Sequence, residues 1–161
     1  MGTSRQLTYR EGGIRDTKKV IELCETWWHE SAWFKNTQMP FESKPEYWYA
    51  LFQAGVMIGT VGENEEGEVK AAYVAVKQPY MFNHAYNTAS EVVWCIDADY
   101  RNGPNLVNLL KSIEDVCKKH EINIYNLNLP VQEDTVKLSG NLEKRGFFKQ
   151  DLSLFKEIKN G

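Results

Sequence analysis

Apolar residues recur at helical spacing in four parts of the chain. The clearest helix is predicted after Gly103, where apolar side chains step by 3, 1, 3, 3 and 1 and share one face. Asp16 and Ser43 precede two other such stretches, Asp16 as a candidate cap and Ser43 as the start of S-K-P-E, a capping-box pattern with proline in the first turn. Residues 134–145 are also predicted to be helical, ended by Gly146. The apolar faces of the first three helices are Val20, Leu23, Cys24, Trp27 and Trp28; Tyr47, Trp48, Leu51 and Phe52; and Leu106, Leu109, Leu110, Ile113, Val116 and Cys117.

The segments between these helices are rich in β-forming residues. Residues 56–61 and 69–77 flank an acidic turn that contains glycine and are predicted to pair as a hairpin. The order β, α, α, β, β, β, α, β, α, β, β predicts an α/β (α+β mixed) fold, a single domain over residues 1–161 with a central mixed sheet flanked by helices. The remaining strands are expected at 7–10, 91–97, 122–129, 147–148 and 152–158, and functional loops at 31–42 and 80–89.

The length and composition are those of a globular domain that needs no disulfide bond or bound metal to be stable. A chain of 161 residues buries roughly 70% of the surface that its unfolded form exposes. Its 22 acidic and 19 basic residues give a net charge of −3, which argues against a general nucleic-acid binder. No apolar run approaches the ~20 residues of a membrane span, and no secretory signal follows Met1. Three cysteines without close spacing indicate reduced thiols and a cytoplasmic location.

Several short motifs that mark nucleotide, metalloprotease or hydrolase sites are missing from the sequence. It contains no G-x-x-x-x-G-K-[ST], G-x-G-x-x-G, H-E-x-x-H or G-x-S-x-G. The three histidines, His29, His84 and His120, lie far apart in sequence, so no metal is expected.

The most informative segment is the strand, turn and helix over residues 91–119. Gly103 allows the turn to bend tightly, and Pro104 suits the first helical position because its missing N–H is not needed there. Amides at a helix start lack internal partners and attract phosphate, and Arg101 can add a charge-assisted contact. The alternative is an ordinary connection without a ligand, which the spacing alone favours. The amides expected to point outward are those of Asn105, Leu106 and Val107.

The stretch I-D-A-D-Y-R-N-G-P-N-L-V-N-L-L resembles motif A of the GNAT superfamily of acyl-CoA-dependent N-acyltransferases. Downstream, N-L-E-K-R-G-F-F resembles the closing element of that family. The sequence is most similar to small phage and bacterial GNAT-like proteins of unassigned substrate. The resemblance implies a mostly antiparallel GNAT-like sheet, acetyl-CoA as co-substrate, and transfer of its acetyl group to a primary amine.

The resemblance also implies roles for individual residues. Glu91 is the candidate general base, although a solvated charge at a strand end is the alternative interpretation. Backbone amides at a bulge near Cys95–Asp97 would polarise the thioester. Cys95 shares a face with Glu91 if the strand is regular, which admits a minor route through an acyl-enzyme. The implied cofactor contacts are Cys95, Ile96, Asp97, Arg101, Asn102, Gly103, Pro104, Asn105 and Leu106.

Trp33 and Phe34 are the candidate walls of the acceptor site, and the acceptor is an unidentified amine. Leu142 stands where many family members carry an acidic tyrosine, so the general acid is open between Tyr125, Tyr86 and solvent. Asn126 and Asn128, on a neighbouring strand, either contact the substrates or face water. Neither a membrane nor a nucleic-acid partner is expected, and a homodimer is one option for the assembly. A GNAT-like fold that binds without catalysis, or serves a structural role in a phage, is the alternative function.

Overall fold

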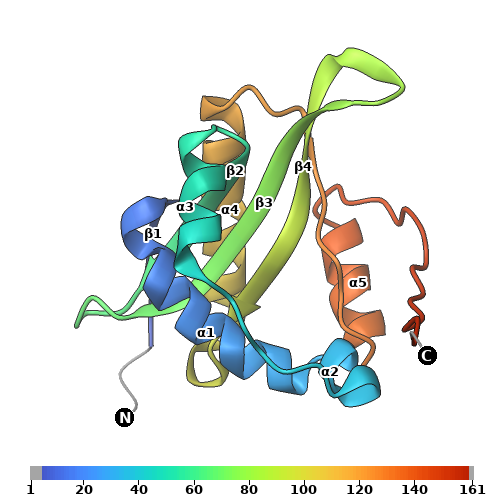
Figure 1. The fold of residues 1–161 in the computed structure, drawn as a ribbon. Helices are drawn as coiled ribbons and strands as arrows, with labels where there is room; N and C mark the ends of the chain where they lie inside the picture. The colour runs from blue at the N-terminus through green and yellow to red at the C-terminus, as the bar shows by residue number, and fades with distance from the viewer. Residues whose placement is uncertain (1–4, 160–161) are drawn as a thin grey trace.

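The computed structural model describes residues 5–159, so the N-terminal start examined for a secretory signal lies mostly outside the described residues. A five-stranded sheet lies at the centre of the fold, with helices on both of its faces (Figure 1). The strands are β1 (Thr8–Gly12), β2 (Met57–Glu63), β3 (Val69–Tyr80), β4 (Asn83–Ile96) and β5 (Ile124–Tyr125). The helices are α1 (Thr17–Glu30), α2 (Ala32–Thr37), α3 (Pro45–Gln53), α4 (Gly103–Lys119) and α5 (Thr135–Glu143), with short 3₁₀ turns at Ile14–Asp16 and Ala98–Tyr100.

The sheet has the order β1-β2-β3-β4-β5, with antiparallel pairing throughout except between β4 and β5. The predicted hairpin over 56–77 is β2–β3, in which Met57 pairs with Val76. β4 and β5 are parallel, and they pair only at Thr88 with Ile124 and at Ala89 with Tyr125. The expected mixed, mostly antiparallel sheet is therefore confirmed.

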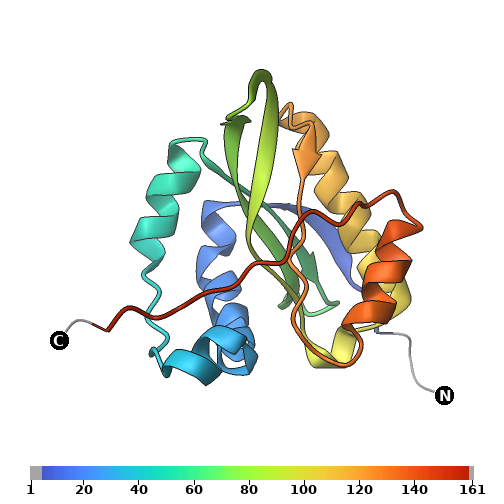
Figure 2. The same ribbon diagram turned by 90° about the vertical axis from the view of Figure 1, so that its right-hand side faces the viewer.

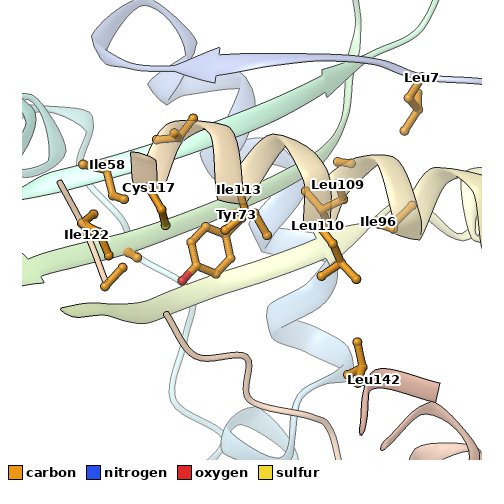
Figure 3. Close-up of a cluster of buried hydrophobic side chains, with 14 residues drawn as sticks. Leu7, Ile58, Tyr73, Ile96, Leu109, Leu110, Ile113, Cys117, Ile122 and Leu142 are labelled. Carbon is orange, nitrogen blue, oxygen red and sulfur yellow. The ribbon is translucent and has the colours of Figure 1, made fainter. Parts of the chain in front are cut away.

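Helix α4 covers one face of the sheet and buries the apolar stripe predicted for it. Figure 3 shows the α4 side chains packed with Tyr73 of β3 between the helix and the sheet. Leu109 is fully buried, and Leu106 is the one residue of the stripe that is half-buried. Burial of each such side chain contributes about 1.5–3 kcal/mol. The buried members of the stripe are Leu109, Leu110, Ile113, Val116 and Cys117.

Helices α1 and α3 cover the opposite face and form a second core, in which Trp48 packs with Val20 and Cys24. The caps expected for these helices are not formed by side chains. Asp16 precedes α1, but its carboxylate is held by the Arg10 guanidinium and the Gly13 amide instead of the α1 amides.

The start of α3 differs in a similar way. Ser43 lies outside the helix, where its hydroxyl accepts from the Trp48 indole at 2.9 Å, and Lys44 occupies the capping position. The capping box is therefore wrong, whereas proline in the first turn is confirmed. Tyr47, expected on the buried stripe, is 69% exposed.

Two expected loops are regular structure. The 31–42 connection contains α2, and 80–89 forms the end of a long β3–β4 hairpin whose turn is Met81-Phe82. This hairpin extends beyond the helices in both views (Figures 1 and 2). The turn residue Phe82 is 87% exposed.

The C-terminal strands expected at 147–148 and 152–158 are wrong. Residues 147–159 cross the β4–β5 side of the molecule toward α2, instead of running along β5 (Figure 2). Without a parallel course they have no ladder to join, and Phe148 stays 93% exposed. At its start Phe147 packs edge-on against Tyr125, and further along Phe155 stacks on Trp33 with ring centroids 4.0 Å apart. No helix within residues 5–159 is long and apolar enough to span a membrane.

Candidate functional site

A β-bulge in β4 lies at the centre of the candidate site. Val74 of β3 pairs with Val93, but the next residue, Ala75, pairs with Glu91, so Val92 is an extra residue in β4. A bulge bends its strand and redirects the side chains around it. The bulge therefore lies upstream of its expected position at Cys95–Asp97, directly beside the candidate base.

Because of this bulge, Glu91 and Cys95 lie on opposite faces of the sheet. Val93 belongs to the core under α1 and α3. Ala89, two residues before Glu91, belongs to the core under α4. Cys95 follows Val93 to the α1 face and is buried next to Cys24 there. The expectation of a shared face is therefore wrong, because it assumed a regular strand.

The Cys95 thiol has the properties of a core residue. Its hydrogen bond with the Cys24 thiol and its burial raise its pKa well above the usual value for cysteine. A raised pKa leaves little thiolate at neutral pH, and the thiolate is the nucleophilic form. The geometry and the pKa both argue against an acyl-enzyme at this position.

Glu91 is half-buried, and its carboxylate is held by one neighbour. Asn128 donates to it twice, from the backbone amide to Oε1 at 3.1 Å and from Nδ2 to Oε2 at 2.7 Å. Burial raises the pKa of Glu91, and the two hydrogen bonds from Asn128 oppose part of that rise. A glutamate with a raised pKa is better matched to accepting a proton near neutral pH than an exposed one.

Beyond the bulge, β4 and the segment after β5 are joined through side chains. The last backbone contact runs from the Asn126 amide to Ala89 O at 3.3 Å. Asn126 Oδ1 then accepts from the Glu91 amide at 2.8 Å, and Asn128 O accepts from the Trp94 indole at 2.7 Å. The backbone ladder between the two segments therefore ends where the bulge begins. We call the part of β4 beyond this point, which within the described residues has no backbone partner on this side, the open edge.

The open edge of β4 presents alternate backbone groups. The Asp97 amide donates to Lys70 O of β3 at 2.7 Å. Since residues in an antiparallel ladder alternate between bonded and non-bonded pairs, Cys95 is also bonded to β3, whereas Ile96 faces the open edge. Of the three amides expected to polarise a thioester, those of Cys95 and Asp97 are therefore engaged elsewhere, and that of Ile96 is directed to the site.

The start of α4 is capped by its own residues. Asn102 Oδ1 accepts from the Asn105 amide at 2.8 Å, and Asn102 O accepts from the Leu106 amide at 3.1 Å. The expectation that these two amides lack internal partners is therefore wrong, because the helix begins at Gly103 and Asn102 is its N-cap. Pro104 lies in the first turn and has no N–H. Gly103 is the first residue of α4, so its amide has no partner within the helix, and nothing lies within 4 Å of the place that a Cβ would take.

The Asn105 side chain also points away from the helix start. It is fully buried, accepts from the Leu7 amide at 3.1 Å, and donates to Arg5 O and to Tyr100 O at 2.8 Å each. It therefore ties the chain before β1 to the turn before α4.

Arg101 links the end of β4 to the end of α1. Its Nε donates to Ile96 O at 2.7 Å, and one terminal nitrogen lies 3.6 Å from the Glu30 carboxylate of α1. Its side chain is 54% exposed, so the ion pair with Glu30 is weak and can exchange for another anion. Arg101 thus provides a positive charge beside the Gly103 amide.

The structure does not bring all the candidate acceptor and acid residues to this edge. Trp33 lies on α2 against Phe155, and Phe34 packs edge-on to His29 at 4.8 Å. Leu142 is buried under α4. The Tyr125 hydroxyl donates to Glu114 of α4 at 3.4 Å, and its burial raises its pKa, which makes it a poor acid there. Tyr86 lies on the projecting hairpin, 46% exposed.

Sequence reasoning missed Trp94, whose indole holds Asn128 in place. The available signal was a tryptophan placed between two buried residues of a strand. Its partner, Asn128, lies in a segment that only the fold brings close. Within residues 5–159, no group of three or more His, Cys, Asp or Glu side chains is placed to hold a metal ion.

No protein-family model and no curated protein matches this chain in sequence. Its fold does match solved acetyltransferases. An aminoglycoside acetyltransferase from an uncultured soil metagenomic sample superposes with a TM-score of 0.73 at 11% identity, covering 95% of this chain and 99% of that one. Another from such a sample, in complex with sisomicin, gives 0.71 at 12%, covering 95% and 97%. Ribosomal-protein-alanine N-acetyltransferase from Brucella melitensis biovar Abortus 2308 gives 0.64 at 13%, covering 96% and 99%.

These similarities extend over nearly the whole chain at low sequence identity. They show that the chain has the fold of acetyltransferases, which confirms the GNAT-like architecture that the motif resemblance implied.

Proposed function

We propose that this protein is an acyl-CoA-dependent N-acyltransferase that moves an acetyl group from acetyl-CoA to a primary amine. The observation that carries the proposal is the position of Glu91. In a fold shared with acetyltransferases, a half-buried carboxylate with a raised pKa lies at a bulge, beside the open edge where β4 leaves β5. Perturbed carboxylates in such positions are candidates for proton transfer.

The reaction needs a base because the acceptor must react as a neutral amine. The pKa of an alkylamine, ~10.4, is about 3.4 units above pH 7, so its deprotonation at that pH costs roughly 4.6 kcal/mol. The amine nitrogen attacks the thioester carbonyl carbon, the C–N bond forms, and the C–S bond then breaks. Glu91 accepts the proton that the amine loses, and the thiolate of CoA leaves and is protonated from solvent. A positioned base commonly contributes 10²–10⁴-fold.

The described residues fit acetyl-CoA with fewer amide donors than the sequence predicted. The Ile96 amide, on the open edge of β4, would donate to the thioester or pantetheine. The Arg101 guanidinium and the Gly103 amide would hold the diphosphate, with Arg101 exchanging its weak contact to Glu30 for the stronger anion. Asn105 and Leu106 do not take part, since their amides are engaged.

The acceptor is proposed by class. The structures named above act on or bind aminoglycosides, or carry the name of a ribosomal-protein-alanine N-acetyltransferase. Both acceptor classes present a primary amine beside hydrogen-bonding groups. The first acceptors to test are therefore aminoglycosides such as sisomicin and short peptides with an N-terminal alanine.

The test is a free-thiol assay with acetyl-CoA and this panel of amines. The proposal predicts turnover that Glu91→Gln lowers by at least a hundredfold while acetyl-CoA still raises the melting temperature. Arg101→Glu should abolish that rise in melting temperature. Ser90→Ala, at the exposed neighbour of Glu91, is the matched control and should leave turnover unchanged. Turnover that is equal in Glu91→Gln and the wild type would contradict the role of Glu91.

One observation favours the alternative of a binding protein without catalysis. Asn102 occupies an amide at the start of α4 that a diphosphate would otherwise take. Binding of acetyl-CoA without turnover of any amine in the panel would support this second function.

A further inference from the structure

We infer that Asn128 is the positioning residue of this site: its amide and backbone fix the Glu91 carboxylate at the point where β4 and the segment after β5 separate. The inference rests on the proposed function, in which Glu91 accepts the proton of the amine. Asn128 reaches no reacting atom itself and acts through Glu91.

The contacts that carry the inference involve both oxygens of the carboxylate. Nδ2 of Asn128 donates to Oε2 at 2.7 Å, and its backbone amide donates to Oε1 at 3.1 Å. Two donors from one residue fix the plane of the carboxylate as well as its position. Hydrogen bonds to an ionised acceptor are about twice as strong as neutral ones.

Asn128 is itself held from two sides. Its carbonyl oxygen accepts from the Trp94 indole of β4 at 2.7 Å. Its side-chain oxygen faces Nδ2 of Asn126 at 3.5 Å, which leaves Nδ2 of Asn128 directed at Glu91. Asn128 is therefore held against β4, and its side chain cannot rotate away from Glu91 without breaking these contacts.

Asn126 completes the arrangement from the backbone side. Its Oδ1 accepts from the Glu91 amide at 2.8 Å, and its carbonyl oxygen accepts from the Tyr73 hydroxyl of β3 at 3.2 Å. Tyr73 is the titratable group that faces Glu91 from β3, and burial, followed by neighbouring groups that include Glu91, raises its pKa so that it stays neutral. The charge of Glu91 is thus stabilised mainly by neutral amide donors.

This arrangement has a consequence for catalysis. Burial opposes the ionised form of Glu91, and the Asn128 donors favour it. Loss of the side-chain donor should therefore raise the pKa of Glu91 and also release the carboxylate from its fixed plane. The higher pKa leaves less of Glu91 ionised at a given pH and moves the acid limb of the rate profile. The lost orientation lowers the rate of the ionised form and therefore the plateau.

The experiment follows the Glu91 carboxyl directly by ¹³C NMR titration of glutamate-labelled protein, with the signal assigned through Glu91→Gln. The wild type is compared with Asn128→Ala and Asn128→Asp. Asn123→Ala is the matched control, because it removes a similar side-chain bond between the same two segments, from the Asn87 amide at 2.9 Å, away from Glu91. The pH profile of kcat/KM is measured on the same proteins.

The Glu91 titration should move to higher pH in Asn128→Ala and further in Asn128→Asp, where two carboxylates compete for one proton. It should stay in place in Asn123→Ala. The acid limb of kcat/KM should move with it, and the plateau should fall about tenfold in Asn128→Ala. The KM for acetyl-CoA should be unchanged.

An unchanged Glu91 titration in folded Asn128→Ala, or an equal shift in Asn123→Ala, would overturn the inference. If Asn128→Ala does not fold, Trp94→Phe keeps an aromatic side chain but removes the indole donor to Asn128, and should raise the pKa of Glu91 by less than Asn128→Ala would. If the wild type turns over no amine, the proposed function fails, while the NMR titration still decides whether Asn128 holds Glu91.

Discussion

Replacement of Asn105 by alanine should be among the most destabilising polar substitutions in this protein. The side chain is fully buried and makes three hydrogen bonds: it accepts from the Leu7 amide at 3.1 Å and donates to Arg5 O and Tyr100 O at 2.8 Å each. Alanine leaves one amide and two carbonyl groups without these partners, next to the core under α4. The chain before β1 is then no longer tied to the start of α4.

The magnitude follows from those three bonds. A typical hydrogen bond contributes about 1 kcal/mol net, and a buried group that loses its partner costs about 1–3 kcal/mol. Three such groups give about 3 kcal/mol, with access of water to the Arg5 carbonyl reducing the cost. This is a large share of the 5–15 kcal/mol by which a domain is typically stable.

Urea unfolding followed by tryptophan fluorescence measures the loss as a lower midpoint at an unchanged slope. Asn108→Ala is the matched control, because it makes the same change at an exposed position one turn further along α4. It should alter the free energy of unfolding by less than about 0.5 kcal/mol. If Asn105→Ala lowers the free energy of unfolding by less than about 1 kcal/mol, Asn105 does not hold the chain before β1 to the start of α4 in the way argued above.

Three further predictions concern stability and reactivity. Burial raises the pKa of Asp16, but hydrogen bonds from Arg10 and Gly13 outweigh it and lower the pKa. Asp16 therefore stabilises the fold above its unfolded pKa and loses this effect as the pH falls through its lower folded value. Asp16→Asn should cost about 3 kcal/mol at pH 7 and flatten the acid limb of a urea-midpoint profile. Gly59→Ala should cost about 2 kcal/mol by calorimetry, because a Cβ would meet Tyr73 O at 2.9 Å; an unchanged melting temperature would contradict this close approach. Burial, followed by Glu114, raises the pKa of Cys117 to about 11, so iodoacetamide at pH 8 should label it by mass spectrometry only after urea is added.

The sequence pattern was sufficient for elements whose stability is local or strongly periodic. The stripe from Leu109 to Cys117 predicted α4 because one apolar face has to be buried whatever covers it. The acidic turn between β2 and β3 predicted their hairpin for a similar reason, since neighbouring strands with a short connection pair with each other. The S-K-P-E pattern failed at Ser43 because the Trp48 indole, not a helix amide, took its hydroxyl.

The candidate site was predicted as a region but not in its detail. Glu91 could be selected from its place before Arg101. No local sequence signal predicts that Val92 is an extra residue, and this insertion puts each later side chain of β4 on the opposite face from the one a regular strand would give. The partners of Glu91 come from Asn128, which lies 37 positions away. Likewise, the family resemblance assigns Asn102 and Asn105 to cofactor contacts, and only the fold shows that Asn102 caps α4 and that Asn105 binds the chain before β1.

The central claim is that acetyl-CoA binds along the open edge of β4 beside Glu91. The most direct test is a titration of ¹⁵N-labelled protein with acetyl-CoA, followed by amide chemical shifts. The amide signals of Ile96, Arg101 and Gly103 should shift together and saturate, and Arg101→Glu should abolish the response. A separate cavity of about 230 Å³ is lined by residues that include Glu11 and His120. Shifts confined to that cavity, or no shifts at millimolar acetyl-CoA, would contradict binding at the open edge.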